Sequence, residues 1–553
     1  MRVSAELKGR RLFAALVLLA LLPSLLAVAA FASQPPASTP GPPAYDPLPL
    51  DKTPLLEALW VGELQRTRRL TRAAVGQAAP FLAQPVFPER VPTIVLVQRE
   101  APYALAELQQ RFPQAFGRVD DAPLLTSSLQ VLAGASLQLD SRETPALRLA
   151  SSPEGFTTII ATRGAIGLTG TADRPVTVSS WDTARGAVDD DASDGRSFLL
   201  TLGGRMDLAY ADVGHLGFGT GSSSGLAWRG EPEGDGLPVA RAQGDVSSST
   251  LHNNRFGAFT FEAQGMRWSD NAFVDNDAYG FDPHDLSNDF VVERNVAHGN
   301  GRHGFIFSRG CDRNVLRNNV AFDNRGHGFM IDDGRSEDSL TAEARLLPSN
   351  DNQLLDNWAY DNDGSGIELE GGSGLLVRGN TLERNHVGIR VKDQASATVE
   401  GNTALDNRLA GVDVLAGAGD VLVDGNRVRG GWAGITLGDT ARTRLVANGV
   451  GDTSTPLVVG GVSQRRETLA GTISQFYRWN PVLVLWTAIL GVPVLVGLFG
   501  PLRRLARRRG PRMRPSILGV PVLIGWVGRG RHRQPGLLGR LARRRGPRMR
   551  PAT

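Results

Sequence analysis

The sequence predicts an all-β protein, a right-handed parallel β-helix with a small mixed N-terminal region and terminal membrane segments. Three observations predict this fold. A motif recurs every 22 to 24 residues, each copy contains a short strand of alternating apolar and polar residues, and each copy opens on an asparagine. A repeat of this length cannot bury its own apolar face, so its copies are expected to stack into a solenoid.

The repeat is clearest between residues 271 and 439. The spacings between its leading asparagines are 24, 24, 38, 23, 22 and 24 residues, and the spacing of 38 includes a 14-residue insertion at 335–348. Asparagine tolerates tight turns and can bond its equivalent one coil away, which predicts a stacked amide ladder. The seven asparagines are Asn271, Asn295, Asn319, Asn357, Asn380, Asn402 and Asn426.

A strand follows the glycine of each copy. Its first and third positions are apolar and the residues between them are mostly polar, which is the period of a half-buried strand. A leucine-rich-repeat horseshoe is the alternative fold, but its LxxLxL spacing is missing. The first position is held by Phe281, Phe305, Phe329, Ile367, Ile389, Val412 and Ile435.

The region before the repeats divides into three segments. Residues 1–32 are basic and then apolar, which predicts a cleavable signal peptide or an uncleaved membrane anchor. Residues 33–50 are rich in proline and predict a linker. Residues 51–125 combine two helical patterns with a strand-like stretch, so we expect a mixed α/β region.

The rest of the chain is predicted to be a β-helix domain at 126–460, a transmembrane helix at 480–500 and a basic tail at 501–553. A buried core helix is the other interpretation of the apolar run. The tail contains a duplication, because residues 505–515 recur at 541–551. Arginines directly after an apolar span stay on the cytoplasmic side, so the β-helix is predicted to be extracytoplasmic at the cell membrane.

Charge is distributed unevenly along the chain. The total is +4, but residues 501–553 carry 16 arginines and no acid, and residues 1–11 carry a net +3, which leaves about −15 on residues 12–499. The tail arginines are not interleaved with aromatic residues, so they favour anionic lipid over nucleic acid. The single cysteine, Cys311, excludes an internal disulfide.

Equivalent positions in successive coils form columns, because neighbouring coils lie roughly 4.8 Å apart. Counting from the glycine of each copy brings six residues together on three adjacent coils of one sheet, namely Asp282, His284, Ser308, Arg309, Asp332 and Asp333. An imidazole, carboxylates and a guanidinium on neighbouring coils form a candidate site.

The segment YGFDPHD, residues 279–285, carries the centre of this cluster. Pro283 removes a hydrogen-bond donor from the strand, a cost that makes sense if the backbone is bent to aim the acid and the imidazole on either side of it. The residue before the glycine gives a column of rings, Tyr279, His303 and His327. The candidates for substrate binding are Tyr279, His303, Ser308, Asp332, Arg390 and Lys392.

YGFDPHD, followed one coil later by HGFIFSR, resembles the DPHD signature of the periplasmic-type mannuronan C5-epimerases of alginate biosynthesis. That family folds as a right-handed parallel β-helix, and the resemblance covers roughly residues 125–450. It implies that His284 removes the C5 proton and that Arg309 neutralises the substrate carboxylate. It also places Asp282 in the catalytic group and gives Asp285 an orienting role.

The implied activity is C5-epimerisation of β-D-mannuronate to α-L-guluronate in a polyuronate. A C5–H bond beside an ionised carboxylate is a weak acid, so an arginine on the carboxylate offsets the developing charge. Histidine titrates near neutral pH and suits the general base. The proton donor for the opposite sugar face stays open between Tyr279, His303 and a bound water.

Two alternatives share these residues. A polysaccharide lyase begins with the same proton abstraction and then expels the 4-O group, and a non-catalytic β-helix would only bind cell-surface glycan. No cofactor or metal is predicted, although the acids Asp332, Asp333 and Glu370 could hold a calcium ion. The predicted partners are a polyanionic polysaccharide, the membrane and a polysaccharide synthesis or export machinery, and no nucleic acid.

Overall fold

The computed structural model describes residues 53–233, 237–335, 346–438 and 442–460. The predicted signal or anchor, the linker, the transmembrane helix and the basic tail all lie outside the described residues. None of the helices in the described part of the chain has the length and apolar character needed to cross a membrane.

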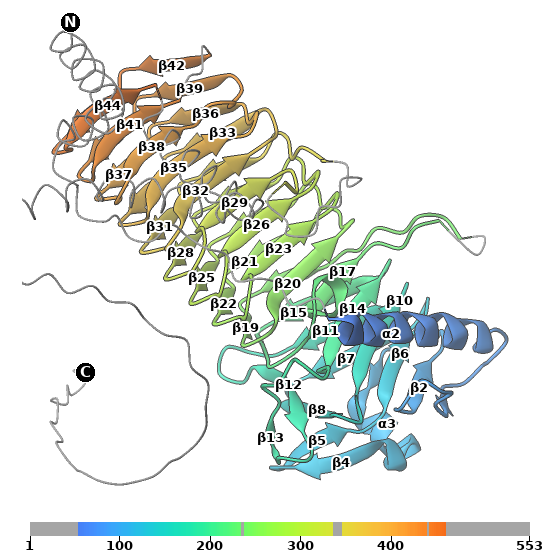
Figure 1. Cartoon of the computed structure of the whole chain (residues 1–553). Coiled ribbons are helices and arrows are strands. Elements are labelled where there is room, and N and C mark those ends of the chain that lie inside the picture. Colours follow the sequence, from blue (N-terminus) through green and yellow to red (C-terminus); the bar gives the residue numbers. More distant parts are fainter. Residues whose placement is uncertain (1–52, 234–236, 336–345, 439–441, 461–553) are drawn as a thin grey trace, which may run out of the picture. The chain divides into compact units, whose positions relative to one another are not determined.

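The chain winds through three sheets in turn, so that most coils add one strand to each sheet (Figure 1). Sheet A contains β1 (Phe81–Ala83), β2 (Thr93–Leu96), β6 (Ser128–Val131), β10 (Thr158–Thr162), β14 (Phe198–Leu202), β17 (Gly225–Arg229), β20 (Phe256–Phe261), β23 (Phe281–His284), β26 (Phe305–Ser308), β29 (Phe329–Asp332), β32 (Ser365–Glu370), β35 (Val387–Lys392), β38 (Ala410–Val414), β41 (Ala433–Leu437) and β44 (Thr455–Val459).

The other two sheets complete each coil. Sheet B contains β3 (Tyr103–Ala104), β7 (Ser136–Asp140), β11 (Ala165–Thr169), β15 (Arg205–Ala209), β18 (Asp245–Ser247), β21 (Arg267–Ser269), β24 (Val291–Glu293), β27 (Val315–Arg317), β30 (Gln353–Leu355), β33 (Leu375–Arg378), β36 (Ala397–Glu400), β39 (Val421–Asp424) and β42 (Thr443–Val446). Sheet C contains β4 (Phe116–Val119), β5 (Ala122–Leu125), β8 (Ala146–Ser152), β9 (Gly155–Phe156), β12 (Val176–Asp182), β13 (Ala187–Val188), β16 (Ala211–Gly214), β19 (Thr250–His252), β22 (Ala272–Val274), β25 (Val296–His298), β28 (Val320–Phe322), β31 (Trp358–Tyr360), β34 (Thr381–Glu383), β37 (Thr403–Leu405), β40 (Arg427–Arg429) and β43 (Gly449–Gly451).

Strands of successive coils pair in parallel, for example β23 with β20 and β26. Among the named strands, antiparallel pairing is confined to β1–β2, β4–β5, β8–β9 and β12–β13, and isolated antiparallel bridges join Thr171 to Arg174 and Glu231 to Ala240. Three parallel sheets around one core confirm the predicted β-helix and exclude the horseshoe. The core is filled by the positions predicted to point inward, such as Phe305 and Phe329, whose rings stack with centroids 4.9 Å apart. Burying each such ring contributes roughly 1.5–3 kcal/mol.

The asparagine ladder is present and links successive coils by hydrogen bonds. Asn319 donates its backbone N–H and its Nδ2 to Oδ1 of Asn357, over 2.9 and 3.0 Å, and its own Oδ1 accepts the same pair from Asn295. A second ladder, which the sequence alignment did not single out, runs in the same way through Asn276 and Asn300. These buried amides satisfy backbone groups at the turns, where strand pairing ends.

The β-helix begins before the predicted boundary at residue 126. β2, β3 and β5 already pair in parallel with strands of the following coil and form the first coil. Two short helices interrupt that coil, α3 (Leu105–Arg111) and η1 (Pro113–Ala115), and it carries no asparagine repeat. For these reasons the sequence pattern predicts a separate mixed α/β region in place of a first coil.

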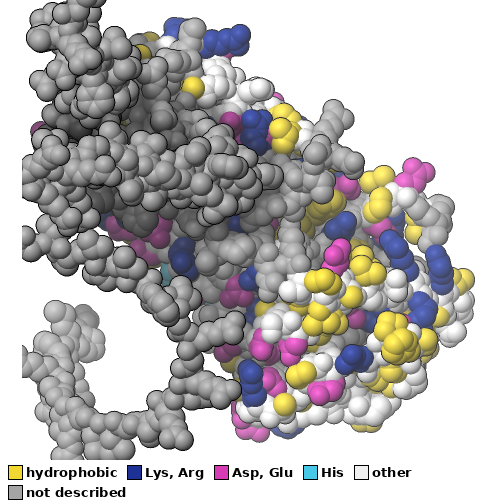
Figure 2. All heavy atoms as spheres, viewed as in Figure 1, with side chains coloured by type: hydrophobic (Ala, Val, Ile, Leu, Met, Phe, Trp, Pro, Cys, Tyr) yellow, Lys and Arg dark blue, Asp and Glu magenta, His cyan; other side chains and the backbone are white. Residues whose placement is uncertain are grey.

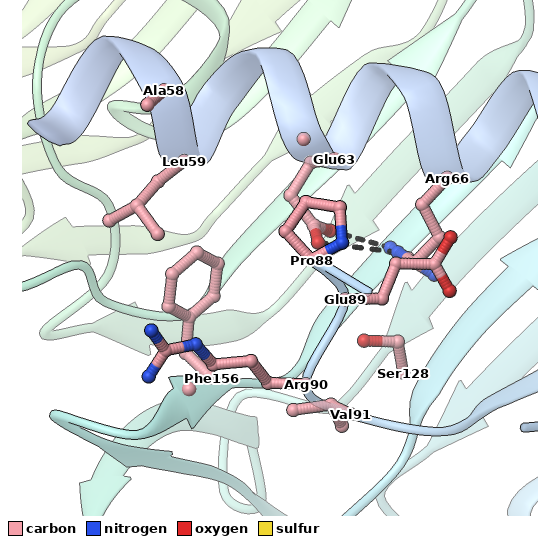
Figure 3. A pocket seen from close by; sticks show the side chains of 12 residues that line it. Ala58, Leu59, Glu63, Arg66, Pro88, Glu89, Arg90, Val91, Ser128 and Phe156 are labelled. Carbon is pink, nitrogen blue, oxygen red and sulfur yellow. Dashed lines mark hydrogen bonds and ion pairs between the residues drawn. The ribbon is translucent and has the colours of Figure 1, made fainter. Parts of the chain in front are cut away.

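Helix α2 (Pro54–Ala73) lies across the outer face of sheet A near β10 and β14 (Figure 1). Its first turn is capped by Thr53, whose Oγ1 accepts from the N–H of Leu56 over 3.3 Å. Arg66 is buried against the sheet and donates to the hydroxyls of Thr93 and Thr158, each over 2.8 Å. Figure 3 shows Arg66 and Glu63 above a pocket of about 100 Å³ between α2 and residues 88–91. The helix therefore covers the first coils of sheet A.

Candidate active site

Strand β23 carries the centre of the predicted cluster on the outer face of sheet A. Its pairing with β20 sets His284 beside Phe261, and its pairing with β26 sets His284 beside Ser308. No pair forms between β23 and β26 at Asp282 or Pro283, where the ladder lacks the proline N–H. The predicted columns are therefore correct, and the predicted weakening of the strand lies between the acid and the imidazole.

His284, Asp285 and Arg309 form a hydrogen-bonded relay. Asp285 Oδ2 bonds His284 Nδ1, and Arg309 Nε donates to Asp285 Oδ1 over 3.1 Å. Burial alone would raise the pKa of Asp285, but the hydrogen bond and charge of His284 and the charge of Arg309 hold that pKa below its usual value. Asp285 therefore stays ionised at neutral pH and holds the Nδ1 proton of the ring. Nε2 is then the basic nitrogen of the neutral imidazole.

The backbone turns sharply after β23. Asp285 has a φ of 31° and Arg309, at the same turn one coil later, has a φ of 64°. Left-handed residues other than glycine recur at the turns of successive coils, for example Asp270, Arg294 and Asn318, so this conformation is a property of the turns of the fold. At Asp285 and Arg309 the turn places both side chains in the relay.

Ser308 and Asp332 continue the column of His284 on the next two coils. Ser308 Oγ donates to Asp332 Oδ1 over 2.9 Å, and Asp332 also accepts from the backbone N–H of Gly334. The structure thus places the predicted cluster on three adjacent coils, namely Asp282, His284, Ser308, Arg309, Asp332 and Asp333, and it adds Asp285 beside His284.

Tyr279, His303 and His327 form a stack of rings at the opposite end of these strands. Neighbouring centroids lie 5.5 and 4.8 Å apart, with nearly parallel planes. His303 Nδ1 accepts the backbone N–H of His327, which puts the proton of the neutral His303 ring on Nε2. Burial, with the charges of His327 and Arg302, holds the pKa of His303 well below its usual value. Tyr279 differs, because its hydroxyl accepts from Arg302 Nη1 over 2.6 Å.

Arg390 and Lys392, predicted to bind substrate, are paired with carboxylates. Arg390 Nε donates to Asp413 over 3.0 Å, and Lys392 Nζ lies 3.2 Å from both Glu368 and Glu370. The two cations thus face three acids, because coil stacking sets Lys392 beside Glu370 and Arg390 beside Glu368 and Asp413. This stretch is a mixed-charge network rather than a positive surface.

Glu370 is the acid of that network whose pKa is raised. Burial raises its pKa to about 7, helped by the charge of Asp332 and opposed by Lys392. The sequence suggests Asp332, Asp333 and Glu370 as the acids that could hold a calcium ion. Among the described residues, no group of three or more histidine, cysteine or acidic side chains is arranged to hold a metal ion.

Two residues near the site were not predicted from the sequence, namely Arg302 and Arg229. Arg302 lies in the turn before the glycine, where the side chains vary from copy to copy, and nothing in the repeat marks it as the partner of Tyr279. Arg229 ends β17, ahead of the first aligned copy, and an irregular register between β17 and β20 hides its place in the repeat. The pocket in Figure 3 is a separate feature beneath α2.

Comparison with known proteins supports the fold and shows which enzymes the chain is similar to. A family model described as a right handed beta helix region matches residues 231–343 and 337–450. A mannuronan C5-epimerase of Pseudomonas putida is 26% identical over 277 residues, which are 48% of this chain and 46% of that protein. Mannuronan C5-epimerase AlgG of Azotobacter vinelandii is 29% identical over 221 residues, 39% of each chain.

This chain is similar to mannuronan C5-epimerases. It spans less than half the length of these two curated relatives. A crystal structure of the periplasmic alginate epimerase AlgG superposes with a TM-score of 0.57 at 21% identity, over 65% of this chain and 85% of that one. That likeness supports the right-handed β-helix, and the resemblance predicted from YGFDPHD is confirmed by the relatives.

Proposed function

We propose that this chain is a polysaccharide-modifying enzyme that epimerises β-D-mannuronate to α-L-guluronate at C5 within a polyuronate. The observation that carries the proposal is the relay of Asp285, His284 and Arg309 on the outer face of sheet A. The relatives named mannuronan C5-epimerase and the solved structure named periplasmic alginate epimerase support it.

His284 is the proposed general base. Asp285 holds Nδ1, so the substrate C5 proton would be taken by Nε2, and the ionised Asp285 stabilises the imidazolium that results. A positioned base of this kind contributes typically 10²–10⁴ in rate. Asp282, buried one strand position before Pro283, is proposed to belong to the same catalytic group.

Arg309 is the proposed partner of the substrate carboxylate. Its Nε is held by Asp285, so the guanidinium is fixed beside the base while its remaining N–H donors can face a ligand. Removing the C5 proton sends charge into the adjacent carboxylate, and a fixed guanidinium stabilises that charge without reorganising. One carboxylate, Asp285, thereby positions both the base and the electrophile.

Tyr279 is the proposed proton donor for the opposite sugar face. The Arg302 hydrogen bond would stabilise the phenolate that remains after donation. His303 is less suited, because its low pKa leaves it neutral at working pH. Ser308, Asp332, Arg390 and Lys392 are proposed to contact neighbouring sugars or to hold the network that does.

Incubation of the full-length protein with polymannuronate, followed by proton NMR, tests the proposal. We expect guluronate signals from the wild type and none from His284→Ala. New unsaturated ends that absorb in the ultraviolet would identify a lyase instead. A folded wild type without activity on any polyuronate would overturn the enzyme proposal and leave a glycan-binding β-helix.

We also propose that the β-helix works outside the cytoplasm. Two observations support this proposal. The similar solved structure is that of a periplasmic alginate epimerase, and residues 1–32 of this chain contain an apolar run. The membrane anchor, the transmembrane helix at 480–500, the cytoplasmic tail at 501–553 and an export-machinery partner stay predictions from the sequence.

A further inference from the structure

Arg229 lies in the same outward column as His284, two coils earlier. β17 pairs with β20 so that Arg229 sits beside Phe261, and β20 pairs with β23 so that Phe261 sits beside His284. With coils roughly 4.8 Å apart, the backbone positions of Arg229 and His284 are separated by about 10 Å along sheet A. Arg229 is thus on the α2 side of the relay, and the mixed-charge network of Arg390 and Lys392 is on the other side.

The guanidinium of Arg229 is held in place by two uncharged neighbours. Its Cζ lies 4.3 Å from the centroid of the Phe261 ring, and Nη1 donates to Ser222 Oγ over 3.1 Å. Ser222 belongs to η2 (Gly221–Ser223) and is buried, so the position is well defined. A stacked, hydrogen-bonded guanidinium on a half-buried side chain is preorganised to bind.

Among the described residues, no carboxylate lies within ion-pair distance of Arg229. The acids near it have other partners, since Glu262 pairs with Arg241 over 3.2 Å and Glu231 pairs with Arg163 over 2.5 Å. Other cations along the outer face of sheet A differ in this respect, because Arg309, Arg390 and Lys392 each contact a carboxylate. Burial lowers the pKa of Arg229, and the charges of Glu262 and Asp285 oppose that shift. The side chain remains a cation.

We propose that Arg229 forms a subsite for the ionised carboxylate of a second uronate unit of the polymer. The inference rests on the proposed function, because it takes the sugar at His284 as the reacting unit. The coil spacing is close to the length of one pyranose in an extended chain. Arg309, the proposed partner of the reacting carboxylate, lies one coil beyond His284, but its guanidinium reaches back to Asp285 on the coil of His284. In a chain with two-fold screw symmetry every second carboxylate faces the same side, and two coils separate Arg229 from the coil of His284. Arg229 therefore binds the carboxylate two units from the reacting one.

Two variants of the full-length protein and one matched control test the subsite. Arg229→Gln removes the charge, and we expect KM for polymannuronate to rise about tenfold with kcat little changed, because a charge-assisted hydrogen bond is worth roughly that factor. Arg229→Lys keeps the charge but loses the fork, and an intermediate rise is expected. Arg294→Gln serves as the control. Arg294 lies in the turn after β24 of sheet B, is exposed, and pairs with Asp270 of the preceding coil.

Carboxyl-reduced polymannuronate separates a binding role from a structural one. In affinity electrophoresis of inactive His284→Ala protein, adding Arg229→Gln should weaken retention by polymannuronate about tenfold and leave weak retention by the reduced polymer unchanged. Equal retention of both proteins by polymannuronate, or equal losses on both polymers, overturns the proposal. If the wild type binds polymannuronate without epimerising it, the proposed function fails while this binding test still decides on Arg229.

Discussion

At the scale of single residues, Asp285 is the side chain on which the proposed chemistry most depends. It touches both His284 and Arg309, so Asp285→Asn should disturb the tautomer of the base and the position of the guanidinium together. We expect kcat for guluronate formation to fall at least about 10²-fold. Asp289→Asn is the matched control, because Asp289 lies four residues on and pairs with the exposed Arg313. Equal kcat values in the two variants, with unchanged circular dichroism, would contradict the relay.

Glu370 gives a residue-scale prediction about stability and pH. Its pKa is about 7 in the folded protein against an ordinary value of 4.5, so the folded state favours its protonated form. The contribution of Glu370 to the free energy of unfolding is fully present below about pH 4.5 and is lost as the pH rises through about 7. Glu370→Gln removes that loss, while Lys392 keeps its contact with Glu368. Thermal melts should show the variant more stable than the wild type above pH 7, with the difference vanishing toward pH 4.5. A pH-independent difference would exclude the explanation.

At the scale of secondary structure, the asparagine ladder should carry measurable stability. Asn319→Ala leaves the backbone N–H of Asn295 and the amide of that residue without their acceptor in a buried turn. We expect the free energy of unfolding in urea to fall by at least about 2 kcal/mol, since each unsatisfied buried group costs roughly 1–3 kcal/mol. Asn448 is the last ladder residue in the described part of the chain and is half-buried, so Asn448→Ala is the control with a smaller expected loss. Equal losses would show that the ladder position does not matter.

The same elements explain what the sequence could predict. From Asn271 onward, successive copies of the repeat keep the same register. Counting from one copy to the next therefore predicts the strand positions, the inward-facing residues and the cluster around His284. Before it, counting fails: the first coil has helices in place of regular turns, and Arg229 precedes an irregular register. Side-chain pairing is also beyond a one-dimensional pattern. Counting equivalent positions in successive coils correctly places Lys392 on the outer face of sheet A. Only the packed structure shows that Glu368 and Glu370 already neutralise its charge.

At the scale of the whole β-helix, the outer face of sheet A is unequal on the two sides of His284. Helix α2 covers the first coils through Arg66 on β10 and through Trp60, whose ring lies 6.3 Å from that of Phe198 on β14. Between α2 and β23 only β17 and β20 remain, and η2 lies beside both. On the other side β26, β29, β32, β35, β38, β41 and β44 follow in order. On the face shown in Figure 2, basic and acidic side chains are interspersed over the N-terminal coils, so charge of one sign does not extend the site there.

This asymmetry predicts where an oligomer is modified. With about one sugar per coil, a bound oligomannuronate has room for only about two units on the α2 side of the reacting sugar and for several on the other. The first guluronate formed in a defined oligomer should therefore lie within about two or three units of one chain end, and always the same end. Mass spectrometric sequencing of early products from an end-labelled oligomer measures its position. Guluronate spread evenly along the oligomer would mean that polymer crosses the coils beneath α2, which the packing of Arg66 and Trp60 against sheet A does not allow.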